Sequence, residues 1–214
     1  MFYEPTKQDH GLPHSPLNAC VVPRPVGWIS TLSKEGVLNL APFSFFNLVS
    51  GNPAIAMFSA SSRADGSNKD SQVNAEETGE FVFNLATWEL REPMNLTASI
   101  EEPNFDELHA VGLTTAPSRM IKTPRVSESP IQLECRYQQT VHLPGRSTGH
   151  HSSLILGEVV GVHINDEFVI DGMVDTAKMK PLARLGYHQY STIENTFWMP
   201  LLSADELRES GISV

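Results

Sequence analysis

The alternation of apolar and polar residues along this 214-residue chain predicts many short β-strands rather than long helices. Residues 26–32 are β-branched and aromatic enough for a strand, and Gly36 in the following turn predicts a hairpin. Pro42 interrupts the returning strand, so an edge or a bulge is expected there. The strands expected along the chain cover residues 26–32, 37–40, 54–59, 80–86, 131–141, 154–164 and 168–170.

Helical signals are fewer and shorter. Ser67 followed by Asp70 is a weak capping box and predicts a short helix over residues 72–78 that stops at Gly79. Three further helices are expected: residues 88–100 capped by Thr87, a helix from the capping box Asn104–Glu107 to Gly112, and residues 204–209. Short strands with few helices indicate a mainly β fold, an antiparallel barrel with peripheral helices.

Length, charge and cysteine content narrow the class of protein. The mass of 23.6 kDa and the absence of a long linker predict a single domain over residues 1–214. The formal net charge of -10 argues against nucleic acid as a partner. No apolar stretch reaches the roughly 20 residues that span a bilayer, and no signal peptide is visible, so a cytoplasmic protein is expected. Cys20 and Cys135 form no metal-binding pair, and no metal site is expected.

The stretch around the first predicted helix suits an anion. Arg63 can bind two oxygens, Lys69 adds a point charge, and Ser71 has a hydroxyl that can donate. Amide groups at the start of a helix favour a negative ligand such as phosphate. The alternative is a solvated helix start with ordinary surface charges.

The break at Pro42 suits the edge of a flat ring. A proline at a strand edge leaves backbone donors and acceptors that no neighbouring strand has taken. Ser44 and Asn47 can add side-chain hydrogen bonds, while Phe45 or Trp28 can lie against apolar ring surface.

The neighbouring phenylalanines also have a structural interpretation. Phe43, Phe45 and Phe46 cannot all face one side of a strand, so at least one should pack in the core. Phe43 or Phe46 is the expected core residue.

Taken together, these segments resemble the flavin reductase-like family, the FMN-binding split-barrel proteins that include flavoredoxins and the reductase components of two-component monooxygenases. The resemblance extends over roughly residues 15–192, the expected core of the domain. Its segments are Arg-Pro-Val-Gly-Trp-Ile-Ser-Thr at 24–31, Asn-Leu-Ala-Pro-Phe-Ser-Phe-Phe-Asn at 39–47, Lys-Asp-Ser at 69–71, Gly-Glu-Phe-Val-Phe-Asn at 79–84, and shorter matches at 112–114, 127–135, 157–159 and 184–186. The family usually has threonine where Ser71 stands and often glycine where Tyr187 stands.

The resemblance implies an antiparallel Greek-key split β-barrel that binds FMN non-covalently and reduces flavin with NAD(P)H by hydride transfer to flavin N5. It implies no catalytic acid or base in the chain, a homodimer with the flavin near the subunit interface, and a monooxygenase partner in some members. The residues expected at the cofactor are Trp28, Ser30, Phe43, Ser44, Phe45, Asn47, Ser59, Arg63, Lys69, Asp70, Ser71, Arg184 and Tyr190.

Other functions remain open at this point. FMN could be a prosthetic group for another small-molecule substrate, or the chain could be a non-enzymatic electron carrier. A scaffold that has lost its flavin site is a further alternative. The roles of Arg184, His188 and Tyr190, whether they flank the nicotinamide or are structural, are equally open.

Overall fold

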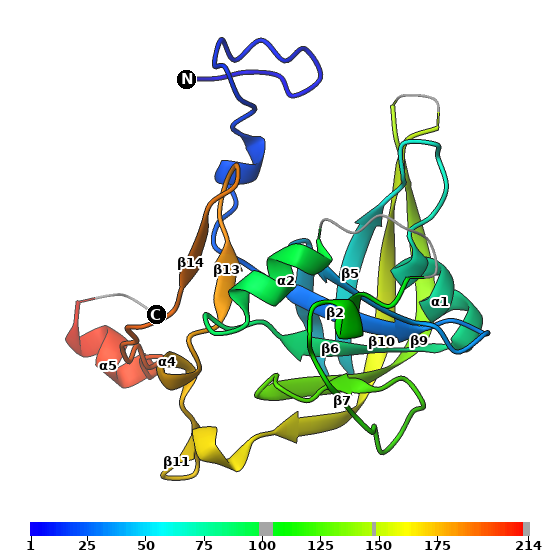
Figure 1. The fold of residues 1–214 in the computed structure, drawn as a ribbon. Helices are drawn as coiled ribbons and strands as arrows, with labels where there is room; N and C mark the ends of the chain where they lie inside the picture. The colour runs from blue at the N-terminus through cyan, green and yellow to red at the C-terminus, as the bar shows by residue number, and fades with distance from the viewer. Residues whose placement is uncertain (99–104, 147–148, 212–214) are drawn as a thin grey trace.

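A seven-stranded antiparallel sheet forms the centre of the molecule in the computed structural model, which describes residues 1–98, 105–146 and 149–211 (Figure 1). The strand order is β3-β2-β6-β9-β10-β5-β4. The strands are β2 (Gly27–Leu32), β3 (Leu38–Phe43), β4 (Phe46–Gly51), β5 (Ala54–Ser61), β6 (Glu80–Leu85), β9 (Ile131–Pro144) and β10 (His151–Ile164). The mainly β, antiparallel class predicted from the sequence is confirmed.

The two edges of this sheet curl toward each other. β3 and β4 are the edge strands, yet only Ser44 and Phe45 separate them in the chain. A Cβ atom added to Gly27 of β2 would clash with the ring of Phe46 on β4. The sheet is therefore a barrel with open edges, whose near-closure depends on a residue without a side chain at this crossing.

Apolar side chains pack on both faces of the sheet. One cluster lies inside the curl and includes Phe43 and Phe46, so both phenylalanines predicted as core candidates are buried. The ring of Phe46 stacks on Phe83 with centroids 4.5 Å apart. The second cluster surrounds Trp28 on the opposite face, beneath α2 (Arg91–Thr97) and α3 (Glu107–Ala110).

The remaining elements are short. They are η1 (Leu17–Ala19), β1 (Arg24–Pro25), α1 (Asp70–Thr78), β7 (Thr115–Ala116), β8 (Arg125–Val126), η2 (Asp166–Phe168), β11 (Val169–Ile170), β12 (Met173–Val174), α4 (Thr176–Met179), β13 (Leu182–Arg184), β14 (Tyr190–Thr192) and α5 (Ala204–Glu209). The N-terminal segment, the β13–β14 hairpin and α5 lie to one side of the sheet (Figure 1). Within the described residues, every helix is too short or too polar to cross a membrane.

Two expectations about helix caps are corrected. Ser67 does not cap α1, because the N-cap is Lys69, and the Ser67 hydroxyl donates to Asp65 instead. Thr87 does not cap α2; it forms a β-bridge with Pro181, and the helix begins at Arg91.

Other predictions differ from the structure at β4, at Pro42 and at the start of α3. β4 is absent from the predicted strands, because its exposed, polar residues give a weak pattern. Pro42 does not interrupt β3, which continues to Phe43, but the expected edge position is confirmed, because β3 is an edge strand and tolerates the missing donor. Asn104 of the expected capping box lies outside the described residues, and the N-cap of α3 is Asp106.

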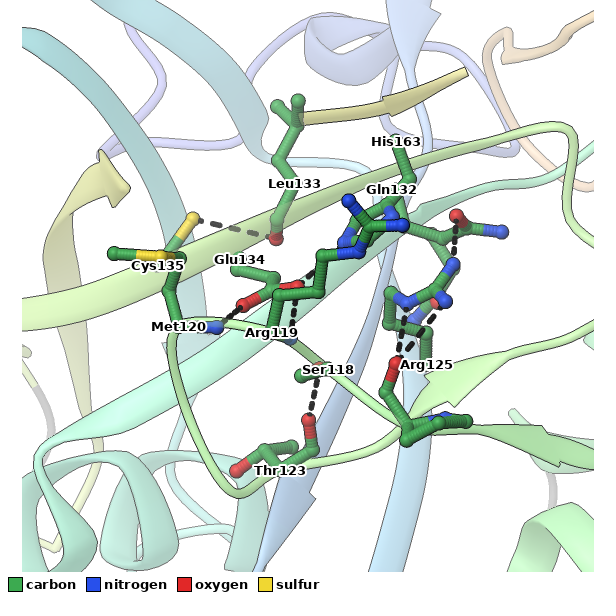
Figure 2. Close-up of polar contacts among 12 residues, drawn as sticks. Ser118, Arg119, Met120, Thr123, Arg125, Gln132, Leu133, Glu134, Cys135 and His163 are labelled. Carbon is green, nitrogen blue, oxygen red and sulfur yellow. Dashed lines mark hydrogen bonds and ion pairs between the residues drawn. The ribbon is translucent and has the colours of Figure 1, made fainter. Parts of the chain in front are cut away.

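A buried carboxylate holds the segment 117–123 against the sheet. Glu134 of β9 is fully buried, and its carboxylate accepts hydrogen bonds from Arg119 N at 2.8 Å and Met120 N at 2.7 Å. The Nε2 atom of His163 on β10 donates to the same carboxylate at 2.5 Å (Figure 2). Three donors surround this one acid, so its role is to fix the segment in place.

Candidate functional site

A cavity of about 490 Å³ lies where β3, the β5–α1 loop and α1 meet the ends of α2 and α3. Its walls mix polar and apolar groups. The residues that line it are Asn39, Ala41, Pro42, Phe43, Ser61, Ser62, Arg63, Ala64, Asp65, Lys69, Asp70, Ser71, Thr97, Ala98 and Glu107. Its volume is in the range of small-molecule and cofactor sites, roughly 300–1,000 Å³.

One wall of the cavity is cationic. Lys69 is the N-cap of α1 and is exposed, and no carboxylate of the described residues pairs with it. Arg63 is held by an ion pair with Asp70 at 3.0 Å and donates to the backbone carbonyl of Asn68. The first amide groups of α1 have no acceptor within the helix. This wall therefore combines a free cation with unpaired amide donors, a combination that favours an anion.

The loop that carries this wall is attached to the start of β10. Ser62 N donates to the carbonyl of His151 at 2.9 Å, and Nε2 of His151 lies 2.8 Å from Oδ1 of Asn68. Gly66 has a φ of 86° and lies close to Gly149: a Cβ atom added to Gly66 would be 3.1 Å from the Gly149 carbonyl oxygen. These contacts fix the loop from its outer side, so Arg63 and Lys69 keep their positions on the cavity wall.

The floor of the cavity is a buried polar cluster. An amide atom of Asn39 lies 2.8 Å from the Oγ of Ser71, and Oε2 of Glu107 accepts from Leu40 N at 2.9 Å. Asn39, Ser71 and Glu107 are at most 6% exposed. A carboxylate and two neutral hydrogen-bonding groups thus face the same enclosed space.

The pKa of Glu107 is strongly shifted within this floor. Its pKa is raised to about 7, chiefly by burial and to a smaller extent by the charges of Asp70 and Asp106, while the hydrogen bond from Leu40 N opposes the shift. Glu107 therefore changes protonation near neutral pH, unlike an ordinary glutamate.

Five of the residues expected at the cofactor line this cavity together. They are Phe43, Arg63, Lys69, Asp70 and Ser71. The start of α1 and the edge strand β3 are distant in the sequence. Both nevertheless line the same cavity. The bond between Asn39 and Ser71, 32 positions apart, joins them directly.

Two of the expected residues lie in the interior instead. Trp28 is fully buried, and its indole Nε1 donates to Thr97 Oγ1 at 3.0 Å. Ser30 is also fully buried and donates to the carbonyl of Pro124 at 2.9 Å. β2 is covered on both faces, so neither side chain lines the cavity. Trp28 is therefore corrected as a candidate to lie against a ring.

Four expected residues surround the turn between β3 and β4, beside the cavity but not on its walls. Phe45 is half exposed, and its carbonyl accepts from Ser59 N at 2.8 Å. Asn47 is exposed on β4 and bonds its own neighbour, Leu48 N. Ser44 links β3 to this turn. The turn is accessible, and its side chains are free to contact a ligand that extends out of the cavity.

The last two expected residues stack on each other in the β13–β14 hairpin. The guanidinium of Arg184 lies 4.6 Å from the ring centroid of Tyr190 and donates to its hydroxyl. Arg184 is opposite Arg24 in the ladder, and Arg24 lies over the Phe45 ring at 5.7 Å. This places Arg184 on the Phe45 side of the site, away from the cationic wall.

Asn39 and Glu107 of the cavity floor are among the lining residues that sequence reasoning missed. Asn39 stands within a family-like segment, but nothing in its local pattern points to a ligand. Glu107 fits a helix-capping pattern, which gives a sufficient local reason for an acid at that position. No local signal identifies either residue, since Asn39 meets Ser71 and Glu107 meets Leu40 only through contacts between distant positions.

Comparison with known proteins decides the family. The model of the flavin reductase like domain matches residues 19–183. The chain belongs to the flavin reductase-like family. A protein of Deinococcus radiodurans is 38% identical over 201 residues, covering 90% of this chain and 86% of that protein. A protein of Aquifex aeolicus is 37% identical over 171 residues, covering 79% and 84%.

Solved structures agree with this flavin reductase-like assignment. Nitrilotriacetate monooxygenase component B from Bacillus cereus is 32% identical with a TM-score of 0.85, covering 93% of this chain and 98% of that one. A protein with a split barrel domain from Shewanella frigidimarina is 21% identical with a TM-score of 0.75, covering 94% of each chain, and shows the fold. Membership of the flavin reductase-like family supports a flavin-related oxidoreductase activity.

Proposed function

We propose that the protein binds FMN non-covalently in this cavity and is an NAD(P)H-dependent flavin reductase. The observation that carries the proposal is the meeting of the cationic amino end of α1 with the edge of β3 in one cavity. The cationic end suits a phosphate dianion, and Pro42 and Phe43 offer apolar surface to a flat ring. These residues fit FMN, whose phosphate and ring are joined by a flexible polyol.

Each part of the site has a separate role in this proposal. Lys69 and the first amides of α1 hold the phosphate, while Arg63, fixed by Asp70, shapes the wall beside it. Ser44, Phe45, Asn47 and Ser59 at the β3–β4 turn contact the ring, and Arg184 with Tyr190 borders the nicotinamide. When bound, FMN would supply the redox chemistry, as the acceptor of a hydride from the nicotinamide at N5. The chain therefore supplies binding and orientation, and we assign no catalytic acid or base.

We also propose that the protein is a cytoplasmic homodimer, with the flavin near the interface between subunits. Cys20 and Cys135 are both free thiols, as expected in a reducing compartment. The similar protein from Bacillus cereus is a monooxygenase component, which supports a separate monooxygenase that receives the reduced flavin.

Titration with FMN and riboflavin tests the site. Lys69→Ala should weaken FMN binding about tenfold, because a charge-assisted hydrogen bond is lost, and leave riboflavin binding unchanged. Lys34→Ala is the matched control, since Lys34 is an exposed lysine that pairs with Glu77 at 3.3 Å. Equal FMN affinity in the wild type and Lys69→Ala would contradict the phosphate assignment.

Anaerobic mixing with NADH and NADPH tests the activity. A flavin reductase should bleach bound FMN with one of them and turn over with free FMN as acceptor. Fast bleaching without turnover of free FMN indicates a prosthetic flavin that serves another substrate. Tight FMN binding without bleaching by either nucleotide indicates an electron carrier.

A further inference from the structure

Three side chains on the cavity floor form a continuous hydrogen-bonded row. One amide atom of Asn39 lies 2.8 Å from Ser71 Oγ, and its other amide atom lies 3.3 Å from Glu107 Oε1. Glu107 Oε2 is already occupied by Leu40 N at 2.9 Å. Asn39 therefore bridges the acid to the hydroxyl, and all three residues border the cavity.

The direction of this row depends on one proton. When Glu107 is ionised, the Asn39 amide nitrogen must point to it, so the Asn39 oxygen accepts the hydroxyl proton of Ser71. When Glu107 is a neutral acid, its O–H donates to the Asn39 oxygen, and the amide nitrogen donates to Ser71 Oγ. The two arrangements differ by a flip of the Asn39 amide, which exchanges the positions of its oxygen and nitrogen.

The two arrangements differ in whether the Ser71 hydroxyl can donate a hydrogen bond to a ligand. In the ionised arrangement, the hydroxyl proton of Ser71 is used inside the row, and only lone pairs remain for the cavity. In the neutral arrangement, the hydroxyl receives a bond from Asn39 and is free to donate to an anion. Ser71 lies in the first turn of α1, beside Lys69, where an anion is expected.

The charges around Glu107 favour the exchange of this proton near neutral pH. Asp70 on α1 and Asp106 on α3 raise its pKa, and burial is the largest cause. His109 of α3 pairs with Asp106 at 2.7 Å, and Arg63 pairs with Asp70, so both nearby acids are partly compensated.

The other elements around Glu107 add few charges. β3 carries no titratable side chain. In α2, Arg91 and Glu92 pair with each other at 3.5 Å at the end of the helix opposite Thr97. The β5–α1 loop adds Asp65 and Lys69 on the cavity wall.

We propose that the ionisation of Glu107 sets, through Asn39, whether Ser71 donates to an anionic ligand in the cavity, so that a phosphate-bearing ligand binds with uptake of one proton by Glu107. The inference rests on the proposed function for the identity of the ligand, a phosphate monoester such as FMN. The bound anion adds negative charge and excludes water, and both effects favour the neutral acid.

Binding of FMN at pH 6.5 and pH 8.5 to four forms tests the row: wild type, Glu107→Gln, Ser71→Ala and the double variant. Gln at this position copies the neutral acid, because its amide can donate to Asn39 and accept from Leu40 N. Wild-type affinity should fall about tenfold more between these pH values than that of Glu107→Gln. The second ionisation of the phosphate, near pH 6, is common to both and cancels in the comparison.

The Ser71→Ala variant identifies the row itself. In the wild-type background it should weaken FMN binding about tenfold at pH 6.5 and much less at pH 8.5. In the Glu107→Gln background, the same change should cost about tenfold at both pH values. A merely structural Ser71 would lose the same affinity in all four cases, which would overturn the inference.

Two further measurements complete the test. Glu77 is an exposed acid near the end of α1, and Glu77→Gln is the matched control. This variant should keep the wild-type pH profile of FMN binding. Calorimetry in buffers of different ionisation enthalpy should register proton uptake on FMN binding near pH 7; proton release would overturn the inference.

If no form binds FMN, the proposed function fails, and inorganic phosphate tests the row in the same four forms. Equal pH dependence of phosphate binding in the wild type and Glu107→Gln would then overturn the inference.

Discussion

Glu107 and Glu134 are both buried carboxylates, and their surroundings shift their pKa values in opposite directions. Burial raises the pKa of both groups. Glu134 has three donors, Arg119 N, Met120 N and His163, which together hold its pKa below the usual value. Glu107 receives backbone hydrogen bonds from Leu40 N and from its own N–H, but it has two acids nearby and, among the described residues, no cationic partner that lowers its pKa, so burial prevails. Donors and neighbouring charges together decide which acid stays charged.

For Glu107, we expect a pH-dependent effect on stability. Its pKa is raised from 4.5 to about 7 in the folded protein, so its contribution to stability is present below pH 4.5 and is lost by pH 7. Relative to wild type, Glu107→Gln should therefore gain about 2–3 kcal/mol of unfolding free energy between pH 4.5 and pH 8. Urea denaturation at both pH values measures this difference. A pH-independent difference would contradict the raised pKa.

For Glu134, we expect a loss of stability on neutralisation. Glu134→Gln removes the charge that two backbone amides and His163 share, and leaves the amide nitrogen of Gln facing donors. The free energy of unfolding should fall by about 2–4 kcal/mol. Glu158→Gln is the control, because Glu158 accepts one exposed side-chain bond from Gln138. A loss no larger than in this control would mean that Glu134 does not anchor the segment 117–123.

At the scale of elements, the approach of the two sheet edges depends on how β2 passes β4. Gly27 leaves room for the Phe46 ring, which in turn stacks on Phe83 of β6. This contact brings the β3–β4 turn, and with it Phe45, over the start of β2. The position of the accessible turn beside the cavity therefore follows from packing inside the sheet.

Gly27→Ala should test this crossing. The added methyl group clashes with Phe46, and we expect a loss of about 1–3 kcal/mol of unfolding free energy. Gly51→Ala on β4 is the matched control, since a Cβ there meets no atom within 4 Å. Adding Phe46→Leu to Gly27→Ala should recover part of the loss relative to the sum of the single changes. Strictly additive losses in urea denaturation would contradict direct packing.

At the scale of the whole molecule, the C-terminal tail exposes a set of apolar side chains. Phe197, Trp198, Met199 and Leu201 are between 79% and 100% exposed. The tail and the N-terminal segment both lie outside the sheet (Figure 1). Exposed apolar groups of this size suit a protein–protein interface, and we propose a second copy of the chain as the occupant, in line with the proposed homodimer.

Sedimentation should therefore give a homodimer of the 23.6 kDa chain. The double variant Phe197→Ser, Trp198→Ser should shift the equilibrium toward monomer, because it removes two large apolar contacts. Met120→Ser is the control, a half-exposed apolar residue of the segment 117–123. A wild-type monomer, or a dimer that the double variant leaves unchanged, would contradict an interface formed by the tail.

The sequence by itself determined the local elements and the residue types that line one wall of the cavity. The strands β2, β5, β6, β9 and β10 and the helix α5 follow from patterns of neighbouring residues. Arg63, Lys69 and Ser71 were predicted as anion ligands for the same reason, because a cationic helix start is encoded within a few positions, and all three line the cavity.

Only the tertiary structure decided which of these groups share a space. It buried Trp28 beneath α2, brought β4 to the edge of the sheet, and joined Asn39 to Ser71 and Leu40 to Glu107. Sheet curvature and contacts between distant segments set these placements, and both depend on how the whole chain packs. Periodicity specifies which way a side chain points from its own strand, but not what lies opposite it.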